Sequence, residues 1–259
     1  MILSSHGIIA SQIASFDADA VAFFGRVTTA GGTLSLTEKQ AVNQLVLDLK
    51  ANSLWTPMKA IYPMVGASAA ACAQNLKSSS FTGTFTSGWT FASTGATGNG
   101  TSAYFDTNLN EDINLTLHNE HLSSYQRNNI TSGCSIGINA TTTTQIFPLT
   151  SGSSSLRVQT GGTIGFTNSD SRGLFIANRT TLAETRNFIR NVLFQQTAVS
   201  TAKNNFNFFI NARNSSGTAA NFAAYEIAFS SIGDGLTDTQ ASNFYTAVQA
   251  FQTTLSRQV

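Results

Sequence analysis

Cleavage of a glycosidic bond needs two carboxyl groups about 5 to 10 Å apart, so the acidic side chains are the first candidates for chemistry. The chain has 13 Asp and Glu residues, and its glutamates do not form the closely spaced acidic pattern of strand-borne glycosidases. The five glutamates stand alone or beside one aspartate: Glu38, Glu111, Glu120, Glu184 and Glu226. The sequence therefore predicts no catalytic residues and a protein that is not an enzyme.

One acidic segment has the alternating oxygen ligands of a calcium loop. Asp106, Asn108 and Asn110 come at every second position. Glu111, however, replaces the glycine that such a loop needs, and Leu117 replaces its closing glutamate. An ordinary Asn/Asp turn is the favoured interpretation, and a calcium ion stays open as the alternative. No other metal and no cofactor are expected.

The other metal-ligand residues are few. His118 and His121 are three positions apart, which in a strand directs the two side chains to opposite faces and argues against a shared ion. Cys72 and Cys134 lack the spacing of a zinc site and are too few for a disulfide framework. Buried free thiols are expected, with a single bridge as the alternative.

Sugar recognition asks less of a sequence than catalysis does, because it needs only hydrogen-bonding groups near an aromatic ring. The candidates for a glycan site are residues of polar loops: Asn168, Asp170, Arg172 and Arg179. Trp89 and Tyr104 could supply an exposed ring. Large aromatic residues in strands more often face the core, and this is the favoured interpretation for both.

The composition limits the partners. Only 10% of the 259 residues are charged, the formal net charge is +1, and Lys and Arg form no cluster of five or more. Nucleic acid is therefore not expected as a partner. No apolar run is long enough to span a bilayer, and the first residues lack the basic flank of a secretory signal. This predicts a product made and kept in the cytoplasm until assembly.

Two helices are predicted before Pro57. Residues 15–27 and 35–52 place apolar side chains at three- and four-residue steps, and the second run opens with a capping-box pattern. The first helix carries more apolar surface than it can cover: Phe16, Val21, Phe23, Phe24 and Val27. We expect this set to attach the chain to other subunits in a homo-oligomer or particle, with packing on the rest of the chain as an equal alternative.

After Pro57 the helical period gives way to short alternating runs separated by Gly, Ser and Asn, which predicts a β-sandwich. Residues 205–211 and 223–230 are expected to form an antiparallel hairpin or to be near neighbours. A glycine-rich turn at 232–236 and an amphipathic helix over 237–256 follow. The apolar stripe of this helix must dock on another element.

Several segments together resemble a known family. They are 62–66, 72–77, 88–95, 99–104 with Asp106, 121–127 and 228–236. These segments resemble the concanavalin A-like, laminin-G-like jelly-roll modules of bacteriophage virion proteins such as fibres, spikes and decoration proteins. The resemblance implies an all-β antiparallel sandwich over 59–236, with helices before it and a closing C-terminal helix. It divides the chain into a helical attachment segment, 1–57, and the sandwich module, 58–259.

The same resemblance implies a function in the virion. The N-terminal segment would hold the chain to other virion proteins, and the sandwich would contact polysaccharide on the host surface. Single sugar contacts are weak, and many copies on one particle would multiply them. A capsid or tail module with no ligand is the second hypothesis, and an enzyme acting on polysaccharide is the third.

Overall fold

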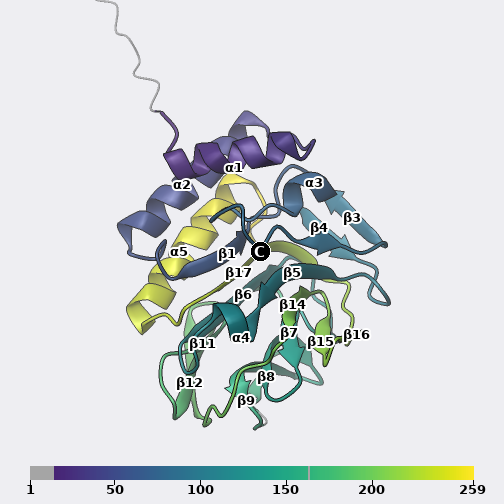
Figure 1. Ribbon diagram of the computed structural model, residues 1–259, viewed down its shortest axis with the longest axis vertical. Helices are drawn as coiled ribbons and strands as arrows, with labels where there is room; N and C mark the ends of the chain where they lie inside the picture. Colours follow the sequence, from purple (N-terminus) through teal and green to yellow (C-terminus); the bar gives the residue numbers. More distant parts are fainter. Residues whose placement is uncertain (1–14, 163) are drawn as a thin grey trace, which may run out of the picture.

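A computed structural model describes residues 15–162 and 164–259 and has three stacked layers (Figure 1). Three long helices form the first layer, sheet A the second and sheet B the third. The long helices are α1 (Ala18–Thr29), α2 (Leu36–Ala51) and α5 (Asp238–Thr254), and the short ones are α3 (Ala69–Cys72) and α4 (Glu111–Asn114). The predicted class, an all-β antiparallel sandwich with N-terminal helices and a closing helix, is confirmed.

Sheet A lies between the helices and sheet B. Its strand order is β13-β12-β11-β6-β17-β4-β3, with β1 paired to β17, and all of its pairs are antiparallel. Its strands are β1 (Met58–Tyr62), β3 (Trp89–Ala92), β4 (Gly95–Gly98), β6 (Glu120–Gln126), β11 (Gly173–Arg179), β12 (Glu184–Ile189), β13 (Val192–Thr197) and β17 (Glu226–Gly233).

Sheet B forms the side of the sandwich farthest from the helices (Figure 1). Its order is β10-β9-β8-β7-β14-β5-β2, and the hairpin β15-β16 joins it through a parallel pair of β15 with β7. Its strands are β2 (Thr84–Phe85), β5 (Phe105–Asn110), β7 (Ile136–Asn139), β8 (Thr143–Thr150), β9 (Ser153–Thr160), β10 (Phe166–Thr167), β14 (Asn207–Ile210), β15 (Arg213–Ser215) and β16 (Thr218–Ala220).

Two apolar clusters hold the layers together. Phe175 and Ile227 of sheet A pack against Ile136 and other residues of sheet B, so this cluster fills the space between the sheets. On the other face of sheet A, Phe229 packs with Phe244 of α5 in a second cluster beneath the helices. The central strands of sheet A, β6, β11 and β17, are therefore buried on both faces.

The helices begin where the sequence predicts. Ser35 and Glu38 form a capping box at the start of α2, and Thr237 and Gln240 form another at the start of α5. In each box the hydroxyl accepts from a backbone N–H of the first turn, and the longer side chain accepts from the N–H of the cap. Because these bonds join residues only three positions apart, the sequence predicts where the helices start.

The N-terminal helices share one core with the rest of the molecule. Phe23 of α1 and Leu45 of α2 belong to the same buried cluster as Phe229 and Phe244. The boundary at residues 57 and 58 stays a prediction. Among the described residues, no helix is both long and apolar enough to cross a bilayer.

One expected strand pair is wrong. The segments 205–211 and 223–230 do not pair with each other, because β14 lies in sheet B and β17 in sheet A. The hairpin β15-β16 occupies the chain between them and carries it from one sheet to the other. The strands were correctly located, but their partners lie elsewhere in the sequence.

Candidate functional site

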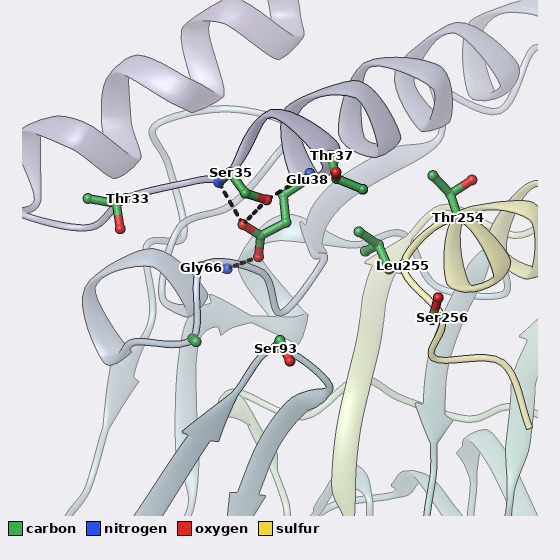
Figure 2. A pocket seen from close by; sticks show the side chains of 10 residues that line it. Thr33, Ser35, Thr37, Glu38, Gly66, Ser93, Thr254, Leu255 and Ser256 are labelled. Atoms are coloured by element: carbon green, nitrogen blue, oxygen red, sulfur yellow. Dashed lines mark hydrogen bonds between the residues drawn. The ribbon is translucent and has the colours of Figure 1, made fainter.

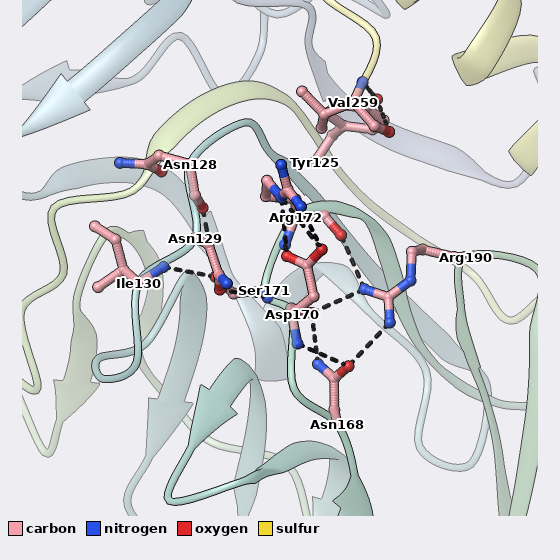
Figure 3. Close-up of polar contacts among 10 residues, drawn as sticks. All are labelled: Tyr125, Asn128, Asn129, Ile130, Asn168, Asp170, Ser171, Arg172, Arg190 and Val259. Atoms are coloured by element: carbon pink, nitrogen blue, oxygen red, sulfur yellow. Dashed lines mark hydrogen bonds and ion pairs between the residues drawn. The ribbon is translucent and has the colours of Figure 1, made fainter.

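Three of the four predicted glycan-binding residues meet in the loop between β10 and β11 (Figure 3). The guanidinium group of Arg172 donates from Nε and Nη2 to the two carboxylate oxygens of Asp170, at 3.0 and 2.9 Å. Asn168 donates from Nδ2 to the backbone carbonyls of Pro148 and Asp170. The Arg172 guanidinium lowers the pKa of Asp170, so this carboxyl group is ionised at neutral pH.

Arg190, which no sequence pattern indicated, completes this cluster. Its Nη1 donates to the carbonyl oxygens of Asp170 and Arg172, at 2.8 and 3.0 Å, and its Nη2 donates to Oδ1 of Asn168 at 2.9 Å. Most polar atoms of the cluster are thus engaged within the protein. The Arg172 side chain is 49% exposed and is the part that a ligand could reach.

Arg179 lies apart from that cluster, at the end of β11, and has no exposed surface. Its guanidinium group donates to the carbonyl oxygens of Val158, Thr181, Leu182 and Ala198. Burial lowers the pKa of Arg179 to about 10, and the group stays charged at neutral pH. Its side chain joins three segments of backbone and offers no surface to a glycan.

The two candidate aromatic platforms pack on neighbouring rings. Trp89 is half-buried, with its ring 4.9 Å from that of Phe85 and its Nε1 donating to the Tyr104 carbonyl at 3.2 Å. Tyr104 stacks on Phe209 with the ring centroids 4.4 Å apart. Trp89 packs against the core between the sheets, as the favoured interpretation expected. Tyr104 is half-buried, but it and Phe209 lie outside both core clusters, so its expected core position is not confirmed.

The residues predicted for assembly divide into two groups. Phe23 and Val27 have no exposed surface and pack beneath α1. Phe16 and Phe24 are half-buried and meet edge to face at 5.3 Å. Val21 is 51% exposed. Attachment through this helix stays a prediction, and Val21 is its most accessible member.

An open pocket of about 470 Å³ lies where the start of α2 meets the end of α5 (Figure 2). The turn between β3 and β4 and the loop after β1 complete its wall. Most of its side chains carry hydroxyl groups: Thr33, Ser35, Thr37, Ser93, Thr254 and Ser256. Hydroxyl groups both donate and accept hydrogen bonds, which suits a ligand that is itself rich in hydroxyl groups.

The one carboxylate that lines this pocket is already engaged. Oε2 of Glu38 accepts from the N–H and the hydroxyl of Ser35 at 2.8 and 2.9 Å, and Oε1 accepts from the N–H of Gly66 at 2.7 Å. Gly66 has a φ of 80°, and a Cβ there would lie 2.5 Å from that of Ala71. Glu38 therefore fixes the pocket wall through both of its carboxylate oxygens.

Two other carboxyl groups meet inside the sandwich, which the sequence did not indicate. Glu111 accepts from the Thr144 hydroxyl at 2.6 Å and from the backbone and side-chain N–H groups of Asn204. Glu120 accepts from Nε2 of Gln159 at 2.7 Å. Burial raises the pKa of both acids, and the charge of Glu111 raises that of Glu120 further. Neither side chain has exposed surface from which to meet a polysaccharide.

The sequence also contains a Gly-x-Ser-x-Gly spacing from Gly133 to Gly137, as in the nucleophile turns of hydrolases. In those enzymes the serine stands exposed between a strand and a helix. Here Ser135 is buried, its hydroxyl donates to the Ile146 carbonyl at 3.1 Å, and the chain continues as strand β7. The hydroxyl group therefore stabilises the contact between β7 and β8.

The segment with the calcium-like pattern forms the end of β5 and the start of α4. Asn110 caps α4, and Asn108 donates to the Thr82 carbonyl at 2.8 Å. Asp112 forms an ion pair with Lys203 at 3.3 Å. Within residues 15–162 and 164–259, no three His, Cys, Asp or Glu side chains gather as metal ligands would.

The histidine and cysteine side chains near the sheets are structural. His121 donates from Nδ1 to the Asp234 carbonyl at 2.6 Å and accepts from the Ser231 hydroxyl at 3.1 Å. Burial lowers the pKa of His121 to about 4, so its ring is neutral. Cys72 and Cys134 are free and buried, and burial raises the pKa of both thiols to about 12.

Comparison with solved structures finds partial similarity to proteins of very different sequence. A single-residue mutant of HCR/D is similar with a TM-score of 0.53 and 9% identity, over 75% of this chain and 53% of that one. The chain is also similar to domain 4 of AbnA, an extracellular GH43 arabinanase from Geobacillus stearothermophilus solved with arabinotriose (TM-score 0.49, 14% identity, 73% of this chain and 98% of that one). The receptor-binding domain of botulinum neurotoxin mosaic serotype C/D has a TM-score of 0.45 and 10% identity, over 74% of this chain and 51% of that one.

By fold the chain is an antiparallel β-sandwich, and HCR/D shares this architecture. The chain spans about half the length of the HCR/D and neurotoxin chains. No family model matches the sequence, and neither does any curated protein.

Within this sandwich the candidate surfaces lie apart. The hydroxyl-lined pocket belongs to the helical side of sheet A, and the Arg172 cluster belongs to the loop before β11. The sequence placed Asn168, Asp170 and Arg172 together because they are adjacent in the chain. It missed the pocket because its walls come from four separate segments.

Proposed function

We propose that this chain is a structural protein of a bacteriophage particle, which contacts host-surface polysaccharide through its sandwich and catalyses no reaction. The pocket between α2 and α5 carries the binding part of this proposal. Six hydroxyl side chains line an open space of about 470 Å³, and Glu38, the carboxylate beside them, is committed to three hydrogen bonds. A site of this kind favours recognition of a neutral, hydroxyl-rich ligand over acid–base chemistry.

The proposed place of the chain in a phage particle does not depend on the pocket. It depends on the segments that resemble phage jelly-roll modules, which lie in β1, β3, β4, β6 and β17 and the loops beside them. An inventory of the proteins in purified particles by mass spectrometry tests it directly. The chain should be present in many copies, and its absence from particles would refute the virion role whatever it binds.

The glycan role is tested by closing the pocket. Ser93 lies exposed in the turn between β3 and β4, so Ser93→Trp places an indole at the pocket mouth without disturbing a buried group. Ser87→Trp is the matched control, because Ser87 is exposed at the other end of β3. On a glycan array, we expect Ser93→Trp to lose the signals of the unaltered protein at least tenfold and Ser87→Trp to keep them. Equal binding by both variants would remove the pocket from the proposal.

A structural module with no ligand is the second candidate, and the exposure of Val21 on α1 favours it. Val21→Asp puts a charge on this surface but leaves the buried side of α1 intact. If the helix contacts another virion protein, this variant folds normally but is depleted from particles. Incorporation at the level of the unaltered chain would argue against attachment through α1.

A further inference from the structure

Two arginines lie in one row across the outer face of sheet B. Arg157 of β9 is the register partner of Gln145 in β8, Gln145 is the partner of Gly137 in β7, and Gly137 is the partner of Arg213 in β15. The residues next to these in β7, β8 and β9 belong to the core between the sheets: Ile136, Ile138, Ile146, Leu156 and Val158. Because side chains alternate along a strand, the row faces away from that core.

Hydrogen bonds connect the row into one surface. Arg213 donates from Nη1 to Oε1 of Gln145 at 3.2 Å, and Arg157 donates from Nε to the hydroxyl of Ser155 at 3.1 Å. Nε2 of Gln145 donates to the same hydroxyl at 3.5 Å. The Arg213 guanidinium also lies over the Phe147 ring, 5.8 Å from its centroid. The amide of Gln145 therefore contacts Arg213 directly and is linked to Arg157 through the Ser155 hydroxyl.

Gly137 leaves the middle of the row without a side chain. A Cβ at this position would come within 2.7 Å of the Gln145 Cβ and 3.0 Å of its Cα, so a larger residue would push β7 and β8 apart. The result is bare backbone beside Gln145 where Arg213 crosses to reach it.

The positive charges of this row have no counterion within the described chain. The ion pairs of the described residues engage other cations: Lys50, Lys59, Arg127, Arg172, Arg186 and Lys203. Burial, and to a smaller degree the charge of Arg213, lower the pKa of Arg157. Two like charges held close together repel each other, and an anion placed between them would relieve both.

We infer that this row, Arg157, Gln145 and Arg213 with Ser155 and Phe147, binds the carboxylate group of an acidic polysaccharide. Guanidinium groups form paired hydrogen bonds with carboxylates, which gives both strength and orientation. The half-buried Phe147 ring supplies an apolar surface for a sugar ring, and the partly exposed Ser155 can meet its hydroxyl groups. The inference rests on the proposed glycan role for its class of ligand, but it uses a different face from the pocket.

The surroundings favour a glycan over an acidic protein. Protein interfaces have a core of large apolar side chains. Among the described residues, the large exposed apolar side chains lie outside β7, β8, β9 and β15: Val21, Leu36, Leu47, Ile113, Leu182, Val192, Leu193, Val199 and Val259. Short hydroxyl and amide groups surround the two arginines instead.

Binding to immobilised polysaccharides by the full chain tests the inference. The probes are polygalacturonate, alginate, hyaluronate and polysialate, with fully methyl-esterified polygalacturonate as the neutral counterpart of the first. We expect at least one acidic probe to bind, the ester to bind at least tenfold more weakly than its acid, and added salt to weaken binding to the acid.

Arg157→Gln/Arg213→Gln should lose at least tenfold in affinity for the acidic probe, with an unchanged melting temperature. Lys39→Gln/Lys59→Gln, which removes the same charge elsewhere, should bind as the unaltered chain does.

The outcomes separate this inference from the proposed function. No binding to any acidic probe, or full binding by the arginine variant, overturns the inference, and neutral glycans held by the pocket would still support the proposed function. Loss of acidic binding in both double variants would mean nonspecific attraction and would also overturn it. If the arginine variant is depleted from particles and no acidic polysaccharide binds, the row is a contact for an acidic virion protein.

Discussion

Glu120, the first residue of β6, interacts with Glu111, the first residue of α4, and both carboxyl groups are fully buried with raised pKa values. One proton held between the two acids would leave a single negative charge in the interior. Donors from Thr144 and Asn204 surround that charge, and Lys203 and Arg179 are the cations that face the pair. This arrangement ties the loop before β6 to sheet B.

The shared proton predicts a pH-dependent stability. Because the pKa values of both acids are higher in the folded chain than in the unfolded one, unfolding releases protons as the pH rises above about 4.5. The free energy of unfolding should therefore fall with increasing pH, by about 1.4 kcal/mol per pH unit for each proton released. Glu120→Gln keeps an acceptor for Gln159 and a donor for Glu111, so its stability should fall less between pH 5 and 8.

Urea unfolding of both proteins over this pH range gives the comparison. Asp48→Asn, a change to a partly exposed carboxyl group on α2, is the control and should follow the unaltered chain. Parallel curves for Glu120→Gln and the unaltered chain would mean that the pair does not share a proton.

A second prediction concerns the two arginines that the sequence grouped together. Arg179→Met would leave four carbonyl groups without their buried donor, and we expect a loss of about 3 kcal/mol or more in the free energy of unfolding. Arg172→Gln removes an exposed ion pair with Asp170 and should leave the melting temperature nearly unchanged. Thermal and urea unfolding measure both, and equal stability of the two variants would contradict the buried role of Arg179.

A third prediction uses the glycines of the closing turn. A Cβ at Gly235 would lie 2.1 Å from the backbone oxygen of Arg179, so Gly235→Ala must shift the turn against sheet A and should destabilise the fold by about 2 kcal/mol. Gly25→Ala, in the middle of α1 with no atom within 4 Å of the added Cβ, should instead stabilise it by about 0.5 to 1 kcal/mol. Urea midpoints that move in the same direction for both would refute this reading of the turn.

A fourth prediction concerns the thiols. Because Cys72 and Cys134 are free, buried and have pKa values of about 12, neither should react with iodoacetamide at pH 8 while the chain is folded. Both should react in strong denaturant, which intact-mass measurement reports as two added groups. Rapid labelling of the native chain would show that one of the thiols is accessible.

The features that the sequence predicted are those that short segments specify. The capping boxes at Ser35 and Thr237 and the apolar stripes behind them locate α2 and α5 within one or two residues. The alternating runs likewise mark β14 and β17. Which strands pair depends on the hairpin β15-β16 between them, and no local pattern encodes that choice.

The candidate sites divide in the same way. Asn168, Asp170 and Arg172 could be grouped because they are neighbours in the chain, whereas Arg190 joins them from another hairpin. Arg179 resembles a surface residue in sequence because polar residues follow it, and only the carbonyl groups that converge on it show why it is buried. The contact of Glu111 with Glu120 and the row from Arg157 to Arg213 arise from strand register.

The layer of α1, α2 and α5 covers sheet A alone, and none of these three helices packs on sheet B (Figure 1). The molecule therefore has one side covered by helices and an opposite side formed by sheet B. Copies fixed side by side through their helices would all turn the same bare sheet toward the medium, so one attachment geometry would orient every copy of Arg157 and Arg213 outward at once. A particle built in this way would repeat this pair of arginines over its outer surface once per copy, although each chain is nearly neutral.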